Sequence, residues 1–329
     1  PPRSTLFPYT TLFRSDNSLV QKFRWQVYYQ DAQANQEASS LRGRGPVATT
    51  LREDVNSFEQ SVFGGDAQFE SSFKTGSINH RLVYGFELFN TETSRPRDRT
   101  EIDLNTGAIN KVISGETYPN KTFPDTDTLR FRLYVQDEIE LANNRLTLIP
   151  GLSFNYYKLT ANPDQDFQNI NISNYDVEDF DASAFSPQLR LNYKVTPELS
   201  AYAQYARGFR SPPYDDANIA FTNFAFGYTV LPNNNLEPET SDSYEIGLKG
   251  SYSQFDFGLT GFYNRFDNFI GTNFVGTTSI NGRDYRQFQS QNLEGAETYG
   301  VEAKAEYRFS PGKEGLSLIG SLAWTEGNN

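Results

Sequence analysis

The segment between residues 208 and 240 holds the side chains of this chain that are best suited to binding a ligand. Aromatic rings pack flat against ligands, the arginine fork matches carboxylates, and amide side chains both donate and accept hydrogen bonds. Proline stiffens the segment, and a run of asparagines favours turns within it. The candidate ligand-binding residues are Phe209, Arg210, Pro212, Tyr214, Tyr228, Asn233, Asn235 and Leu236.

This segment has the features of an ordered loop. Apolar and polar residues alternate just before it, at 199–205, and just after it, at 244–248, which is the pattern of two strands. A loop of roughly thirty residues far exceeds ordinary connections, and such loops are usually functional or disordered. Disordered segments are poor in aromatic residues, whereas this one contains Phe209, Tyr214, Phe221, Phe224, Phe226 and Tyr228. The sequence therefore predicts a binding loop held between two strands.

Catalytic chemistry is not indicated. The chain has a single histidine, His80, and no cysteine, so the common pairs of nucleophile and base are missing. No glycine run has the spacing of a phosphate-binding loop. His80 follows a predicted short turn and shares a strand face with apolar residues such as Leu82 and Phe86, so we expect it on the lipid side, far from the long loops. We expect no enzyme, no metal site and no permanently bound cofactor.

Strands must carry the binding loop, because alternation at period two recurs along the chain from Asp16 onward. In 128–141 one face holds Leu133 and its apolar neighbours, while the other face holds Arg130 and Arg132. An antiparallel all-β fold with one wet face and one apolar face follows. The predicted strands are 18–31, 60–74, 77–91, 128–141, 145–159, 183–195, 198–207, 241–252, 255–269, 295–309 and 315–325.

The predicted connections alternate in length. Short turns are expected at Thr75-Gly76, Ala142–Asn144, Thr196-Pro197, Ser253-Gln254 and Ser310–Gly315, and long excursions at 32–59, 92–127, 160–182, 208–240 and 270–294. Outer-membrane barrels have short periplasmic turns and longer extracellular loops, whereas a β-sandwich has no reason to sort its loops in this way. We therefore predict a transmembrane antiparallel β-barrel. Large transporter barrels have about 22 strands and a plugged lumen, so the roughly eleven strands expected here form an incomplete barrel without a plug domain.

Composition agrees with a barrel in the bacterial outer membrane. The formal charge of −12 and the absence of a basic stripe argue against a nucleic-acid partner. No run of about eighteen apolar residues is present, so a helical membrane span is excluded. The mean hydropathy of −0.62 remains compatible with a barrel, because alternation of lipid-facing and lumen-facing residues gives a weak hydropathy signal.

The first residues need a separate interpretation. The segment Thr5–Ser15 resembles the translation of a widely used sequencing-adapter oligonucleotide. We therefore expect residues 1–15 to be an assembly artefact that is excluded from the fold, and residues 16–329 to be the partial barrel.

Two motifs in the binding loop resemble the paired boxes of TonB-dependent outer-membrane haem and haemoglobin receptors. The first, Phe209-Arg210-Ser211-Pro212, is similar to FRAP, with Ser211 in place of alanine. The second, Pro232-Asn233-Asn234-Asn235-Leu236, is similar to NPNL or NPDL, with Asn234 in place of proline. Farther on, Tyr299-Gly300-Val301-Glu302 resembles a strand signature of TonB-dependent receptors in general.

This resemblance implies an outer-membrane receptor that takes up haem from haemoglobin or similar haemoproteins. The implied partners are haem or a haemoprotein, the outer-membrane lipid, and the TonB complex, which would be reached through an N-terminal plug that is missing here. Haem would be a transported ligand. Tyr214 or Tyr228 could hold its iron through a phenolate, and Arg210 could pair with a propionate or brace an acidic neighbour such as Asp215 or Glu237.

Other cargoes remain open. Members of the haem-receptor family typically carry a histidine between the two boxes, and the interval 213–231 has none. This departure favours a TonB-dependent receptor for a ferric siderophore or an oligosaccharide as the alternative. A passive porin-like channel is a further alternative, although it needs only one constricting loop, and several long excursions are predicted.

Overall fold

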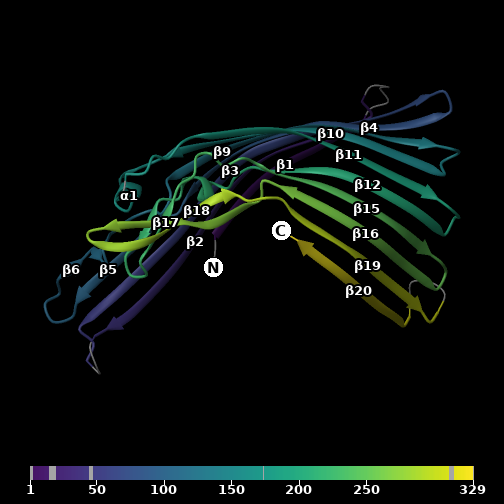
Figure 1. Ribbon diagram of the computed structural model, residues 1–329. Coiled ribbons are helices and arrows are strands. Elements are labelled where there is room, and N and C mark those ends of the chain that lie inside the picture. Colours follow the sequence, from purple (N-terminus) through teal and green to yellow (C-terminus); the bar gives the residue numbers. More distant parts are fainter. Residues whose placement is uncertain (1–2, 15–19, 44–46, 173, 311–314, 329) are drawn as a thin grey trace.

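The computed structural model describes residues 3–14, 20–43, 47–172, 174–310 and 315–328. Its main element is a curved antiparallel sheet that is open at both edges (Figure 1). The strands along it, in spatial order, are β1 (Arg3–Arg14), β2 (Lys22–Arg42), β3 (Thr50–Thr75), β4 (Ile78–Ser94), β9 (Asp125–Leu141), β10 (Leu146–Asn162), β11 (Phe180–Lys194), β12 (Leu199–Arg210), β15 (Glu239–Ser251), β16 (Phe255–Asp267), β19 (Ala296–Arg308) and β20 (Ser317–Asn328). The main path of the sheet consists of all eleven predicted strands and β1, and two short strands pair beside β3.

Alternation along the strands gives this sheet two chemically different faces. On β9, Leu133 and Val135 leave 52% and 41% of their surface exposed on the outer face. On the inner face of the same strand, Arg132 forms an ion pair of 3.6 Å with Glu87 of β4. Exposed apolar side chains on one face and paired charges on the other fit lipid outside and water inside. No helix among the described residues is long and apolar enough to cross a membrane.

Apart from the connection between β2 and β3, the predicted short turns and long excursions lie at opposite ends of the sheet. Figure 1 shows the short turns at one end and the longer excursions at the other. The excursions contain secondary structure of their own: β5 (Arg97–Asp103), β6 (Ile109–Asn110), β7 (Val112–Ile113), β8 (Glu116–Thr117), α1 (Gln165–Gln168), α2 (Tyr214–Asn218), β13 (Phe221–Asn223), β14 (Tyr228–Leu231), β17 (Ile270–Ile280) and β18 (Arg283–Asn292). The long loops are therefore ordered and not solvated coil.

The predicted excursion at 32–59 is wrong. Strands β2 and β3 run on as one hairpin of 21 and 26 residues, with pairing that continues to Arg42 opposite Thr50. The prediction relied on apolar alternation, which stops where both faces of a strand meet water. Backbone pairing needs no regular apolar face, so this hairpin extends well past the alternating segments, to Leu41 opposite Leu51 and Arg42 opposite Thr50.

Residues 3–14, which we excluded from the fold, form β1 at the edge of the sheet. Its backbone pairs with β2 from Arg3 opposite Gln33 to Arg14 opposite Lys22. The exclusion from the sheet is therefore corrected. The adapter origin of residues 1–15 is a separate prediction that this placement leaves open, because an extended aromatic segment of any origin can pair with an open strand edge.

His80 lies where the pattern predicted, two residues into β4 from the short turn. Its ring stacks on Phe73 at a centroid distance of 4.7 Å, and its Nδ1 is 2.7 Å from Asp137 Oδ2. This histidine is thus far along the strand from the long loops.

Candidate functional site

The first box leaves the wall of the barrel and turns onto its inner face. Strand β12 pairs with β11 only as far as Ala206 opposite Gln188, while its last residues, Arg207–Arg210, pair with β15 alone. Beyond this point the chain reaches the inner face of β9 and β10 and forms one side of a half-open cavity of about 710 Å³. The cavity is lined by Tyr28, Gln30, Gln60, Val62, Glu87, Phe89, Thr91, Thr93, Thr128, Arg130, Phe131, Arg132, Asn155, Tyr156, Tyr157, Phe209, Arg210, Ser211, Pro212, Pro213 and Tyr214.

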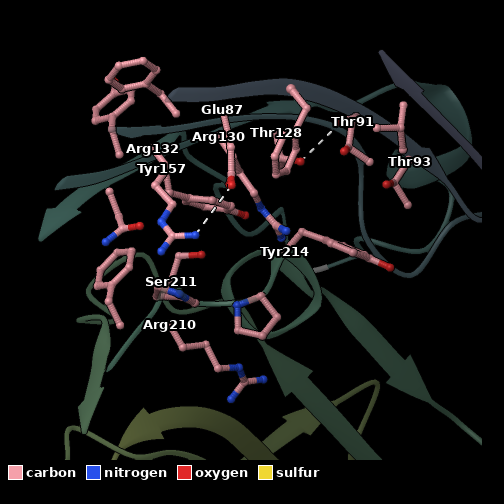
Figure 2. A pocket seen from close by; sticks show the side chains of 18 of the residues that line it. Glu87, Thr91, Thr93, Thr128, Arg130, Arg132, Tyr157, Arg210, Ser211 and Tyr214 are labelled. Carbon is pink, nitrogen blue, oxygen red and sulfur yellow. Dashed lines mark hydrogen bonds and ion pairs between the residues drawn. The ribbon is translucent and has the colours of Figure 1, made fainter. Parts of the chain in front are cut away.

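Two arginines of β9 give this cavity its charge. Figure 2 shows Arg130 and Arg132 pointing into it beside Tyr157 and Glu87. The guanidinium of Arg130 lies 5.6 Å from the Tyr157 ring centroid, and among the described residues it forms no ion pair. Because Arg132 shares its charge with Glu87 at 3.6 Å, Arg130 is the cation of the cavity that is available to an anionic ligand.

The first box and the residues after it contribute to the apolar lining of the cavity, beside Val62, Phe89 and Phe131 of the wall. Pro212 is almost completely buried. Tyr214 begins α2 and packs edge-on against Phe123, with ring centroids 5.0 Å apart. Burial and the nearby carboxylate of Asp215 raise the pKa of the Tyr214 phenol, so the free phenolate is disfavoured at neutral pH. Phe209, Pro212 and Tyr214 thus bring apolar groups to the lining of the cavity that also contains Arg130.

Arg210 braces its own loop, but through a partner that we did not predict. Its guanidinium points away from the other labelled side chains in Figure 2 and lies 2.7 Å from Glu239 Oε2. The other oxygen of Glu239 accepts the backbone N–H of Ile270 at 2.7 Å. The expected partners Asp215 and Glu237 are therefore replaced by Glu239, which joins the ends of two long excursions.

The second box packs against other residues of the long excursions, and none of its residues lines the cavity. Asn233 finds its hydrogen-bond partners in the long excursions: its backbone N–H donates to Ala217 O at 2.9 Å, and its side chain donates to Ser290 O at 2.8 Å. Its Oδ1 accepts the N–H of Asn235 at 3.0 Å. Leu236 is buried against Ala217 and Ile270. Asn233, Asn235 and Leu236 therefore shape the loop, and their contact with a ligand stays a prediction.

Replacing Asn233 with alanine is expected to loosen this junction by about 1–2 kcal/mol, because the buried Ser290 carbonyl and the Asn235 amide both lose a partner. Hydrogen exchange at the amides of Asn235 and of β18 would report the change. Asn234 is the matched control, since its side chain makes one long contact, 3.4 Å to Asp176 O. Equal exchange in the two alanine variants would contradict the role given to Asn233.

Hydrogen bonds join four of the long excursions into one cap over the cavity end of the sheet. Ala220 N donates to Thr122 O at 3.0 Å, and Lys121 N donates to Asp166 O at 3.1 Å. Glu178 N donates to Asn218 Oδ1 at 3.2 Å. In the fourth excursion, β18 pairs in parallel with β14, which builds a small sheet in the order β13-β14-β18-β17. Tyr228 belongs to this small sheet and does not line the cavity.

A buried tyrosine stabilises the cap near β5. The Tyr118 hydroxyl donates to Glu116 Oε2 at 2.5 Å, and Arg97 donates to the same oxygen at 2.7 Å. Burial, together with the Glu116 carboxylate, raises the pKa of Tyr118 to about 12. Since the folded value lies above the usual 10, the neutral phenol stabilises the folded cap.

This stabilisation is expected to be complete below pH 10 and to disappear as the pH rises from 10 to about 12, where an unfolded chain has already lost the proton. Its size is on the order of 2 kcal/mol. The ultraviolet absorbance of the phenolates, compared between the protein and its Tyr118→Phe variant, would test this. The variant should lack one late-titrating phenol. A difference that appears already near pH 10 would refute the raised value.

Sequence reasoning missed the cavity wall. Arg130 was assigned to the wet face of its strand, which is correct, but nothing marked it as part of a site. Tyr157 was likewise not recognised as part of a site. Their position along the strands could have identified them. Both lie a few residues from the long-loop ends of β9 and β10, the ends of the strands at which the first box also lies.

Comparison with known proteins places the fold. The family model described as "TonB dependent receptor-like, beta-barrel" matches residues 3–329. A "Hemin receptor" of Yersinia enterocolitica is 25% identical over 232 residues, which cover 68% of this chain and 27% of that protein. A "Probable hemoglobin and hemoglobin-haptoglobin-binding protein 4" of Haemophilus influenzae is 29% identical over 112 residues, 32% of this chain and 11% of that protein. The matches thus span well under two thirds of these relatives.

Solved structures agree on the architecture. The hemophore receptor HasR of Serratia marcescens, in complex with its hemophore HasA and heme, superposes with a TM-score of 0.71 at 17% identity, over 100% of this chain and 48% of that one. The ferric citrate transporter FecA superposes with a TM-score of 0.68 at 18% identity, over 99% and 42%. At such low identity these likenesses show a shared fold and nothing about cargo.

Proposed function

This chain belongs to the TonB-dependent receptor β-barrel family, whose members are receptors and transporters of the Gram-negative outer membrane, and we propose that it takes part in the uptake of haem from haemoproteins. The observation that carries the proposal is the position of the first box. Phe209, Pro212 and Tyr214 meet Arg130 and Tyr157 in one cavity on the inner face.

The chemistry of the cavity suits haem. A haem is a flat apolar disc with two carboxylates on one edge, and it needs aromatic faces together with a cation. Phe209, Tyr214 and Tyr157 supply the faces. Arg130 supplies a guanidinium without an ion-pair partner among the described residues. Relatives named for hemin and hemoglobin support the same interpretation. Haem is proposed as the transported ligand, with no cofactor held permanently.

We expect passage of the ligand through the barrel to use the same parts as in other members of the family. It would require a plug within the barrel and energy from the TonB complex, which are the partners that family membership implies. Tyr214 lines the cavity, and Tyr228 does not, so Tyr214 is the better of the two tyrosine candidates for an iron ligand.

A ferric siderophore is the second candidate cargo. The absence of histidine from 213–231 favours it, and a guanidinium in the cavity would also suit an anionic siderophore complex. A passive porin is disfavoured, because several excursions are hydrogen-bonded together at the cavity end of the sheet.

The test uses a receptor that contains this chain, in a haem-auxotrophic host without a haem receptor of its own. Growth on haemin or haemoglobin as the sole haem source, lost when Phe209–Pro212 is deleted, is the expected result. Failure to grow on either source, with the protein shown to be in the outer membrane, would overturn haem as the cargo and favour the siderophore.

A further inference from the structure

The small sheet of the loop cap carries a row of aromatic rings that the cavity does not use. Across its four strands, Phe274 lies opposite Phe288, Phe288 opposite Val230, and Val230 opposite Phe221. Residues that pair directly point to the same face of a sheet. The Tyr228 ring lies 6.2 Å from Phe288 and 6.1 Å from Phe221, and Phe274 lies 6.0 Å from Phe288. We name Phe221, Tyr228, Phe288 and Phe274 the aromatic stripe.

The stripe is the accessible face of this sheet. The opposite face is buried: Thr222, Thr229 and Tyr285 expose 2%, 0% and 4% of their surface. The stripe residues are half-buried, and Phe274 exposes 53%. One end of the stripe packs within the cap, because the Arg97 guanidinium of β5 lies 5.2 Å from the Phe221 ring centroid. At the other end, Phe274 stays exposed on its outer side. Exposed apolar surface that is not needed for packing indicates an interaction site.

Positive charge accompanies these rings. The Arg286 guanidinium lies 5.3 Å from the Phe274 ring centroid and 5.2 Å from that of Phe288. Arg283 lies on the opposite face of β18, over the Tyr285 ring at 5.6 Å, and donates to the carbonyl of Phe224 at 3.1 Å. Neither arginine forms an ion pair with any described residue, although the chain has twelve more acidic than basic residues. Asp284, which lies between the two arginines in the sequence of β18, is an acidic residue of this hairpin.

We propose that the aromatic stripe docks a soluble haem-carrying protein whose contact surface presents carboxylates beside an apolar patch. This inference rests on the proposed function. Aromatic residues and arginine are the side chains that dominate binding energy at protein interfaces. Arg286, held over two rings, is pre-ordered to meet a carboxylate. The stripe is an open face on the cap, suited to a broad protein surface, whereas the separate cavity at Arg130 is sized for the small ligand.

The experiment separates protein docking from ligand uptake. Haemoglobin binding would be measured on outer-membrane vesicles that contain the receptor, and growth would be measured on haemoglobin and on free haemin. Phe274→Ser and Arg286→Glu are expected to weaken haemoglobin binding at least about tenfold, as for residues that anchor an interface, and to slow growth on haemoglobin while growth on haemin is unchanged. Arg286→Lys, which keeps the charge, should lie between Arg286→Glu and the parent protein.

Phe226→Ser is the matched control. Phe226 is 82% exposed at the tip of the β13–β14 hairpin and lies outside the stripe, so its replacement should leave both sources usable. Stripe variants that bind haemoglobin as the parent does would overturn the proposal. So would stripe variants that lose haemin and haemoglobin alike, since the defect would then lie in uptake. If the parent receptor itself uses neither source, the proposed function fails, and this inference falls with it.

Discussion

Replacing Glu239 with alanine is expected to detach the two long excursions at 212–238 and 268–294 from each other. Glu239 is buried, and its two oxygens hold Arg210 and the backbone N–H of Ile270. The variant leaves the Ile270 N–H buried without a partner and releases Arg210. We expect the local opening free energy to fall by about 3 kcal/mol. Arg210 contributes the smaller share, because its side chain is 59% exposed and solvent screens the ion pair.

Hydrogen exchange at Ile270 and along α2 would measure this opening. Glu239→Gln keeps an acceptor for the Ile270 N–H but loses the charge opposite Arg210, so it should cost about 1 kcal/mol. Glu237→Ala is the matched control, since the Glu237 side chain accepts one bond, 2.9 Å from Asn268 Nδ2, at the surface. Exchange in Glu239→Ala that resembles the Glu237→Ala control would remove Glu239 from the role described here.

The wall of the barrel could be predicted because its pattern is local. Leu133 and Arg132 are neighbours in the chain. One is apolar and the other is charged, so the sequence of β9 alone indicates which side chains lie on each face. Short turns such as Thr75-Gly76 are equally local, since few residue types suit them. The position of His80 on the outer face, close to a short turn, follows from the same two signals.

The loop cap could not be predicted in this way. The parallel pairing of β14 with β18 joins residues such as Val230 and Phe288 that lie far apart in the chain. No periodicity in either segment encodes that contact, because it depends on where β12, β15 and β16 carry the two loops. The partner of Arg210 was missed for the same reason. Asp215 and Glu237 are in its own loop, whereas Glu239 is opposite Arg210 only through the register of β12 and β15.

The candidate site divides along the same line. The first box could be recognised from its residues, and the structure brings Phe209, Pro212 and Tyr214 to the cavity. The second box was recognised equally well, yet Leu236 is buried in the cap, because an apolar residue in a loop can serve packing as readily as binding. Arg130 was missed because every inner face of a water-filled barrel is polar. Arg130 differs from the other polar residues of the wall in that the loop after β12 reaches β9 beside it, and this contact is visible only in the structure.

Replacing Arg130 with glutamate is expected to have the largest effect on uptake. The cavity would then hold a second carboxylate beside that of Glu87, with Arg132 as its remaining cation from β9, and an anionic ligand would face repulsion where it now meets a guanidinium. We expect haemin binding to weaken on the order of a hundredfold, which corresponds to about 3 kcal/mol for loss of a charge pair and its replacement by a like charge. Haemin titration of the purified receptor would measure the loss, and growth on haemin should fail with it.

The control must show that the loss of haemin binding is caused by the changed charge in the cavity. It must exclude a general effect of replacing an arginine that stacks on a tyrosine with an acidic residue. Arg145 lies over the Tyr193 ring at 5.9 Å, as Arg130 lies over Tyr157, but it sits at the short-turn end of the sheet. Arg145→Glu should therefore leave haemin binding unchanged, and Arg130→Lys should retain part of it. If Arg130→Glu binds haemin as tightly as Arg145→Glu does, the charge of the cavity has no part in recognition. The apolar residues of the first box would then have to carry binding alone, which deletion of Phe209–Pro212 examines independently.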